Sequence, residues 1–179
     1  YPVMIQTQND GVHWTRPHVV IPFTHDNTVV GWTCRFLDNR TPKYISDSQP
    51  NYVFGTDLQK EEWQYALVME GVFDALAING LAVLHADIND AQVRLIRSLG
   101  KEVIVVPDQD EAGMKLVDRA VELGWAVSMP EWPEGVKDVN DAVIKMGKLA
   151  TLITILAAKE SSKIKIELRK RQLVNRLRN

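Results

Sequence analysis

The chain has 179 residues, 45% of them apolar and 25% charged, with a formal net charge of −2. This is the balance of an ordinary folded domain, so a chain disordered throughout is excluded. A transmembrane helix is excluded too, because no run of about 18 apolar residues occurs, and we expect a cytoplasmic protein without membrane contacts. The single cysteine, Cys34, excludes an internal disulfide and a cysteine-rich zinc site. Because residue 1 is Tyr rather than Met, we expect part of a longer protein or a processed one.

Residues 1–57 are rich in turn-forming and β-branched residues, which predicts a small mixed sheet, and we expect residues 1–65 to form part of a separate sub-domain. Two strands are expected at 19–23 and 28–36, and the polar segment 25–27 between them predicts a hairpin. A short edge strand is expected at 41–45, with a proline near its start.

Residues 66–147 alternate between short apolar runs and segments with helical spacing. Strands are expected at 66–69, 81–85, 102–106 and 125–129, and helices at 72–79, 89–99, 111–123 and 138–146. Strands that alternate with helices of about ten residues predict an α/β fold in which a mostly parallel sheet is flanked by helices.

Residues 148–179 predict a basic helical segment. A helix is expected at 149–158, and we interpret 163–168 as helical although its residues alternate like those of a strand. Residues 159–179 contain eight Lys or Arg and two acidic residues, a charge of +6, which leaves −8 on the rest of the chain. Such a tail fits contacts with a phosphate backbone, and it fits equally a solvated helix face or a linker to another domain.

Carboxylates follow the predicted strands at the edge where ligands bind in open α/β sheets. Glu70 follows the first strand, Asp108 and Asp110 follow the third, and Asp138 and Asp141 follow the loop after the fourth. Carboxylates that converge without a nearby cation repel one another, and a hard divalent cation removes that cost. The alternative is that each acid caps the next helix, as Asp110 could do. Three acidic clusters together favour metal binding.

Three segments at these positions resemble the TOPRIM domain of DnaG-type and bacteriophage primases, topoisomerases and some nucleases: Glu70-Gly71-Val72-Phe73-Asp74, Asp108-Gln109-Asp110-Glu111-Ala112-Gly113 and Lys137-Asp138-Val139-Asn140-Asp141. The stretches at 20–23, 29–35 and 41–45 are similar to the sub-domain that precedes TOPRIM in DnaG-type primases. The resemblance implies a Rossmann-like TOPRIM domain at 66–147, preceded by part of a primase-core sub-domain.

The resemblance also implies roles for eight residues. Catalysis and metal binding fall to Glu70, Asp108 and Asp110, with Asp74 and Asp138 as further metal-site acids, and binding of template or nucleotide phosphates falls to Arg35, Lys43 and Lys137. The activity implied is DNA-primase nucleotidyl transfer that makes short RNA primers, with Mg²⁺ or Mn²⁺ as cofactor. The implied partners are single-stranded DNA, NTPs and a replicative helicase, in the host cytoplasm if a bacteriophage or mobile element encodes the chain.

Other functions stay open at this point. A TOPRIM nuclease would use the same metal site on water, an inactive module would only bind nucleic acid, and a small-molecule α/β domain would bind no DNA. Asn140 stands where many bacterial primases have a second acid. The resemblance implies that phage-type members often have Asn at this position. The sequence contains neither a zinc-binding motif nor a Gly-x4-Gly-Lys-Ser/Thr helicase motif.

Overall fold

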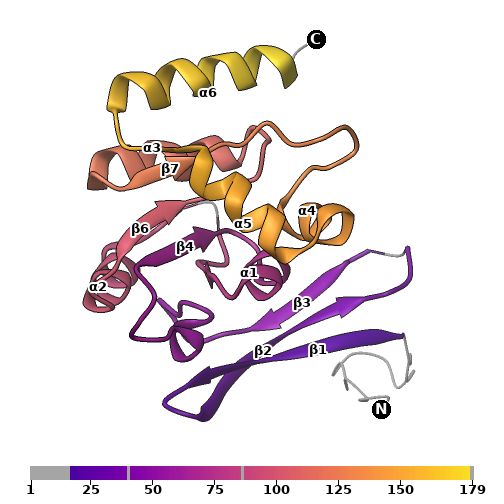
Figure 1. Ribbon diagram of the computed structural model, residues 1–179. Helices are drawn as coiled ribbons and strands as arrows, with labels where there is room; N and C mark the ends of the chain where they lie inside the picture. The colour runs from indigo at the N-terminus through magenta and orange to yellow at the C-terminus, as the bar shows by residue number, and fades with distance from the viewer. Residues whose placement is uncertain (1–16, 40, 86, 178–179) are drawn as a thin grey trace. The chain divides into compact units, whose positions relative to one another are not determined.

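The computed structural model describes residues 17–39, 41–85 and 87–177 (Figure 1). Contacts divide the chain into two compact units, the first ending at Pro50 and the second beginning at Asn51. The second unit confirms the expected α/β fold with a mostly parallel sheet. No helix among the described residues is long and apolar enough to cross a membrane.

The described residues of the first unit, 17–39 and 41–50, contain a three-stranded antiparallel sheet in the order β1-β2-β3. Its strands are β1 (His18–His25), β2 (Thr28–Phe36) and β3 (Tyr44–Asp47). Asp26 and Asn27 connect β1 to β2 with φ values of 50° and 60°, so both adopt the left-handed conformation that a tight two-residue hairpin turn requires. The expected hairpin is therefore present, and the third strand begins at Tyr44, later than the sequence indicated.

The second unit contains a five-stranded sheet in the order β5-β4-β6-β7-β8. The strands are β4 (Tyr65–Met69), β5 (Leu81–Ala82), β6 (Glu102–Val105), β7 (Ala126–Ser128) and β8 (Lys159–Glu160). β5, β4, β6 and β7 run parallel, whereas β8 pairs antiparallel with β7. The sequence analysis did not foresee β8.

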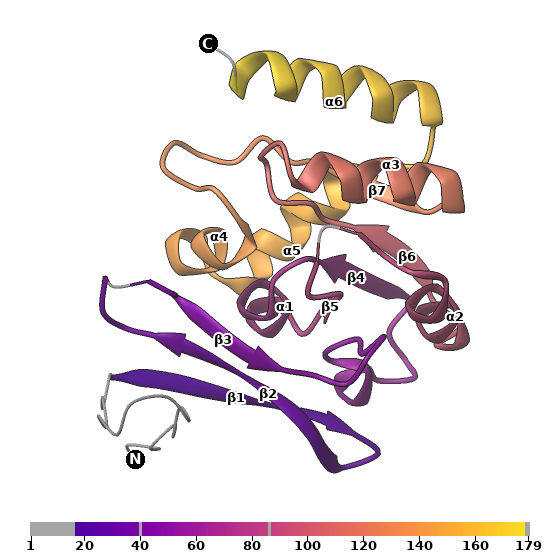
Figure 2. The ribbon, with the colours of Figure 1, turned by 180° about the vertical axis from the view of Figure 1, so that it is seen from behind.

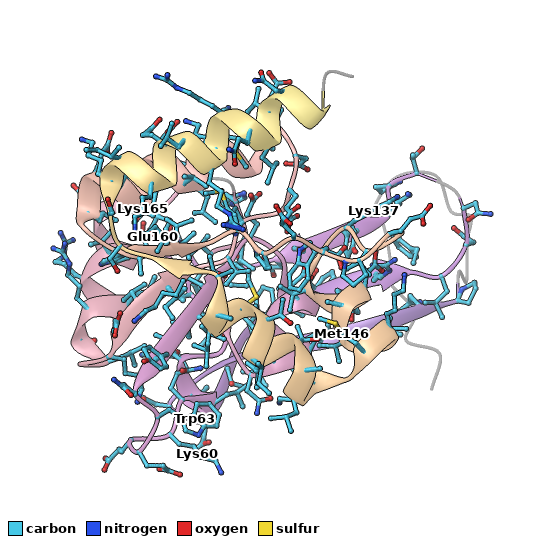
Figure 3. The ribbon with its side chains drawn as sticks, turned by 45° about the horizontal axis from the view of Figure 1, so that its top comes forward. Lys60, Trp63, Lys137, Met146, Glu160 and Lys165 are labelled. Carbon is cyan, nitrogen blue, oxygen red and sulfur yellow. The ribbon has the colours of Figure 1, made fainter. Side chains whose placement is uncertain are left out.

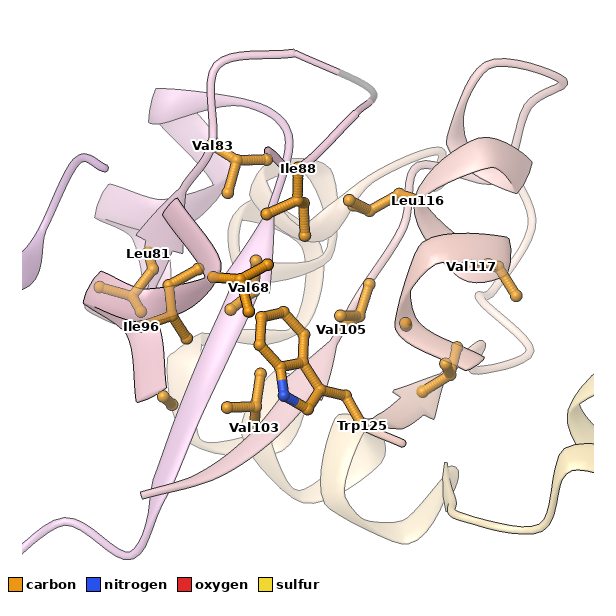
Figure 4. Packing of buried hydrophobic residues seen from close by; sticks show 14 of the residues in the cluster. Val68, Leu81, Val83, Ile88, Ile96, Val103, Val105, Leu116, Val117 and Trp125 are labelled. Atoms are coloured by element: carbon orange, nitrogen blue, oxygen red, sulfur yellow. The ribbon is translucent and has the colours of Figure 1, made fainter. Parts of the chain in front are cut away.

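Six α-helices and a short 3₁₀ helix, η1 (Thr56–Leu58), accompany this sheet. The α-helices are α1 (Val72–Ile78), α2 (Asp90–Ser98), α3 (Gly113–Leu123), α4 (Val139–Met146), α5 (Lys148–Ala157) and α6 (Lys163–Leu177). On one face of the sheet, Val68, Val105 and Val127 pack in a core with residues of α2 and α3 (Figure 4). On the other face, the buried hydroxyl of Ser128 donates a 2.7 Å hydrogen bond to the carbonyl of Ile155 on α5.

Helix α6 lies alongside α3, as Figures 1 and 2 show from opposite sides. Ile166 is buried in the core, Leu173 and Val174 pack against it, and Lys170 forms an ion pair with Asp118 on α3. The strand-like alternation at 163–168 therefore belongs to a helix, as expected, because only one of its apolar residues faces the core.

Candidate metal centre

Glu70 and Asp108 come together because they follow neighbouring parallel strands. Val68 of β4 pairs with Val105 of β6, so the two chains leave the sheet at the same edge. A hydrogen bond of 2.8 Å from the amide of Val106 to the carbonyl of Val68 extends this alignment one residue beyond β6. The Glu70 carbonyl accepts the amide of Leu84 at 3.1 Å, which fixes the backbone where Glu70 leaves the strand.

Asp74 and Asp138 are linked through the start of α4. Asp138 is the N-cap of α4, and its Oδ1 accepts the amide of Asp141 at 2.7 Å. Asp74, buried in the first turn of α1, accepts the amide of Asn140 on its Oδ1 at 2.9 Å. One oxygen of each carboxylate is thereby used in structure. The contact is made by the backbone N–H of Asn140 and not by its side chain. The sequence analysis did not foresee it.

Asp110 holds the turn that leads into α3. Its Oδ1 accepts the amide of Gly113 at 2.8 Å, so this oxygen of Asp110 does bind the start of α3, as the capping alternative expected. Gly113 is required at that place because a Cβ there would overlap the carbonyl oxygen of Asp108. Gly71 plays a similar part, since a Cβ would lie 2.8 Å from Oδ2 of Asp74. Both glycines belong to the site, and the sequence analysis gave them no role.

The carboxyl groups of the cluster are close enough to perturb one another. Burial, followed by the charges of Asp110 and Asp74, raises the pKa of Glu70. Burial raises the pKa of Asp74 to about 6; the hydrogen bond from Asn140 opposes this rise, and the charges of Asp138 and Asp108 add to it. Burial and the charges of Glu70, Asp110 and Asp138 raise the pKa of Asp108 to about 6 as well. The structure thus brings all five predicted acids together; their roles remain a prediction.

The donor set has the chemistry that a hard divalent cation prefers, although among the described residues no three of these acids have carboxylate oxygens within 4.8 Å of one another. Oε1 of Glu70 is buried and has no hydrogen-bond partner among residues 17–39, 41–85 and 87–177, a costly state for a carboxylate oxygen. The acids of the cluster offer oxygen atoms alone, the ligands that Mg²⁺ and Mn²⁺ prefer. An ion held between Glu70, Asp108 and Asp110 would give that oxygen a partner and offset the mutual repulsion.

The three predicted cations are placed differently from the acids. Lys137 is exposed in the loop directly before Asp138, and its amide lies 3.4 Å from Oδ2 of Asp141. Arg35 belongs to the first unit, where its guanidinium lies 5.3 Å from the centre of the Tyr44 ring. Lys43, also in the first unit, is exposed and accepts the amide of Phe36 on its carbonyl at 2.9 Å.

Comparison with known proteins finds a family match and several DNA primases of similar sequence or structure. Residues 67–143 match the family described as Toprim-like. A DNA primase of Halalkalibacterium halodurans is 27% identical over 81% of this chain and 28% of its own length, and one of Clostridium acetobutylicum is 25% identical over 75% and 26%. The solved E. coli primase catalytic core is 25% identical, with a TM-score of 0.66 over 87% of this chain and 57% of that one. The chain therefore spans about a quarter of the length of these curated relatives.

Proposed function

Because residues 67–143 form a TOPRIM-like domain of the DnaG-type primase family, we propose that the chain is part of a primase catalytic core. Its activity would be metal-dependent nucleotidyl transfer that makes short RNA primers on single-stranded DNA from NTPs. Mg²⁺ or Mn²⁺ is the proposed cofactor, and a replicative helicase is the proposed partner in the longer protein or its complex.

The observation that carries this proposal is the cluster of five carboxyls at the edge where parallel strands end. The raised pKa values of Glu70, Asp74 and Asp108 mark groups that are held together at a cost to the fold. Acids with perturbed pKa values at the carboxyl edge of a parallel sheet are typical of functional sites. A purely structural set of helix caps would not need Glu70 or Asp108, because neither carboxylate caps a helix.

Each acid would have a distinct part in the reaction. Glu70, Asp108 and Asp110 would hold the cation, which, when bound, neutralises charge on the α-phosphate during in-line displacement. Asp74 and Asp138 would position the site through their hydrogen bonds to the start of α4. With its raised pKa, Glu70 would also suit a group that orients the attacking 3′ hydroxyl or accepts its proton. Arg35, Lys43 and Lys137 would contact phosphates of template or nucleotide.

Primer synthesis on mixed-sequence single-stranded DNA, with labelled NTPs and Mg²⁺ or Mn²⁺, tests this proposal. We expect oligoribonucleotides from the wild type and none from Glu70→Gln or Asp108→Asn, which keep the shape of each side chain but remove its charge. Glu61→Gln is the matched control, since Glu61 is exposed in the loop before β4. It should leave the product unchanged.

Two other outcomes would overturn the primase proposal in different directions. Cleavage of the DNA, lost in Glu70→Gln and Asp108→Asn, would indicate a nuclease that uses the same site on water. DNA binding that is equal in EDTA and in Mg²⁺, without synthesis or cleavage, would indicate an inactive binding module.

A further inference from the structure

A cleft of about 310 Å³ lies between α6 and the segment that contains β8. Lys159, Lys165, Arg169 and Gln172 are among the residues that line it. Helix α6 has six basic residues and one acidic residue, so the potential around the cleft is positive. The proposed function assigns nothing to this part of the chain.

Most charges at this cleft are already paired. Lys159 contacts Glu102 at 2.7 Å. Glu160 accepts the amides of Ser161 and Ser162 on its Oε1, and its Oε2 lies 3.4 Å from Nζ of Lys165. Figure 3 labels Glu160 and Lys165. These contacts satisfy the one acid that lines the cleft.

Arg169 is the exception. It is half-buried, and across the described ranges of the chain it has neither a hydrogen-bond nor an ion-pair partner. A guanidinium carries five N–H donors in a planar fork that matches the oxygens of a phosphate. An arginine in this setting, lining a cleft on a basic helix, has the chemistry to bind a phosphate group.

The position of Arg169 connects the cleft to the metal centre. Arg169 and Gln172 also line a smaller hollow of about 20 Å³, together with Gln109, Pro130 and Glu131. Gln109 stands between Asp108 and Asp110, and its Nε2 donates a 2.5 Å hydrogen bond to the carbonyl of Pro130. One hydrogen-bonded loop thus lies between the carboxylates and the face of α6 that carries Arg169.

We propose that this cleft binds backbone phosphates of a nucleic-acid strand that extends from the metal centre, with Arg169 as the main contact and Lys165 and Gln172 beside it. The proposal rests on the proposed function for the identity of the strand. A strand is favoured over a free nucleotide because basic residues recur along the sequence of α6, at 163, 165 and 169–171, which suits a repeated phosphate rather than one triphosphate.

Fluorescence anisotropy with a labelled oligodeoxythymidylate of about 15 nucleotides tests the proposal in EDTA, so that metal chemistry is not required. We expect Arg169→Gln to weaken binding about three- to tenfold and to lower the slope of log K against log salt by roughly 0.7. Arg171→Gln is the matched control: it removes the same charge from an exposed position on α6 that does not line the cleft. Arg169→Lys should recover part of the affinity, which excludes misfolding as the cause of a loss.

The same effect from Arg169→Gln and Arg171→Gln would mean that only net charge matters, and would overturn the proposal. So would wild-type protein that does not bind the oligonucleotide, or an Arg169→Gln variant that loses affinity for ATP but not for the strand. Failure of the proposed function would give a different result. If the protein made no primers but its strand binding still depended on Arg169, the primase activity would be refuted and the cleft would remain a strand-binding site.

Discussion

Replacing Asp74 by Asn should stabilise the metal-free protein at pH 8. The pKa of Asp74 is raised from 3.8 to about 6, which at about 1.4 kcal/mol per pH unit corresponds to about 3 kcal/mol of unfavourable free energy in the ionised state. The side chain is only 8% exposed, so solvent does little to reduce this cost. The pKa of about 6 already includes the hydrogen bond from the Asn140 amide, which the oxygen of Asn can accept as well. We therefore expect a net gain of about 3 kcal/mol.

The gain must depend on pH with a definite sign. Because the folded-state pKa of this acid is raised, the folded protein binds the proton more tightly, and stability falls as pH rises from about 4 through about 6. The advantage of Asp74→Asn should thus be complete at pH 8 and shrink to about a third of its value near pH 4.5.

Urea unfolding in EDTA, followed by far-ultraviolet circular dichroism, measures this difference. All described α-helices belong to the second unit, so the helical signal reports the unit that contains Asp74. With a urea m-value of about 2 kcal/mol/M, a gain of about 3 kcal/mol moves the midpoint upward by about 1.5 M. Asp47→Asn, on exposed β3, is the control and should not move it. A variant no more stable than wild type at pH 8, or equally advantaged at pH 4.5, would refute the reasoning.

Two further predictions concern the same site. Mg²⁺ at about 100 times its dissociation constant should stabilise the wild type by about 2.7 kcal/mol at pH 8 and much less near pH 5. The reason is that protons compete for Asp74 and Asp108, whose pKa values are about 6. Urea midpoints with and without Mg²⁺ at both pH values measure this effect, and an equal gain at the two pH values would contradict it. Gly113→Ala should lower the free energy of unfolding by about 1–3 kcal/mol, because the new Cβ meets the Asp108 carbonyl. Exposed Glu61→Gln serves as the control in the same urea assay, and an unchanged midpoint for Gly113→Ala would show that the turn can relax.

The sequence predicted the second unit well where elements are long or bounded by clear signals. Asn89 caps α2 with a full capping box, and Gly124 ends α3 in the left-handed conformation, so those helices lie close to their expected positions. Helix α3 begins at Gly113 rather than 111 because Asp110 takes the Gly113 amide and holds the preceding residues in a turn. This hydrogen bond joins residues only three apart, so the capping interpretation of Asp110 anticipated the contact but not the later start of the helix.

Strand β8 and the roles of two glycines could not be predicted, because the sequence carries no pattern that indicates them. Strand β8 has two residues, Lys159 and Glu160, and two charged residues carry no apolar alternation to recognise. The roles of Gly71 and Gly113 depend on how closely a carboxylate or a carbonyl approaches them, which composition cannot indicate. The convergence of the acids could be predicted because it follows from strand direction alone.

Strand β8 also limits how the second unit can be shortened. By pairing with Val127 and Ser128, it occupies backbone groups of β7 that would otherwise be open to another molecule. A chain cut after Gly147 would lose this strand together with α5, and with α5 the carbonyl of Ile155 that satisfies the buried hydroxyl of Ser128. Such a fragment would retain all five acids of the metal centre, yet it would expose an unprotected β-edge and aggregate. The smallest useful fragment of this unit therefore extends past Glu160, well beyond the last residue of the metal centre.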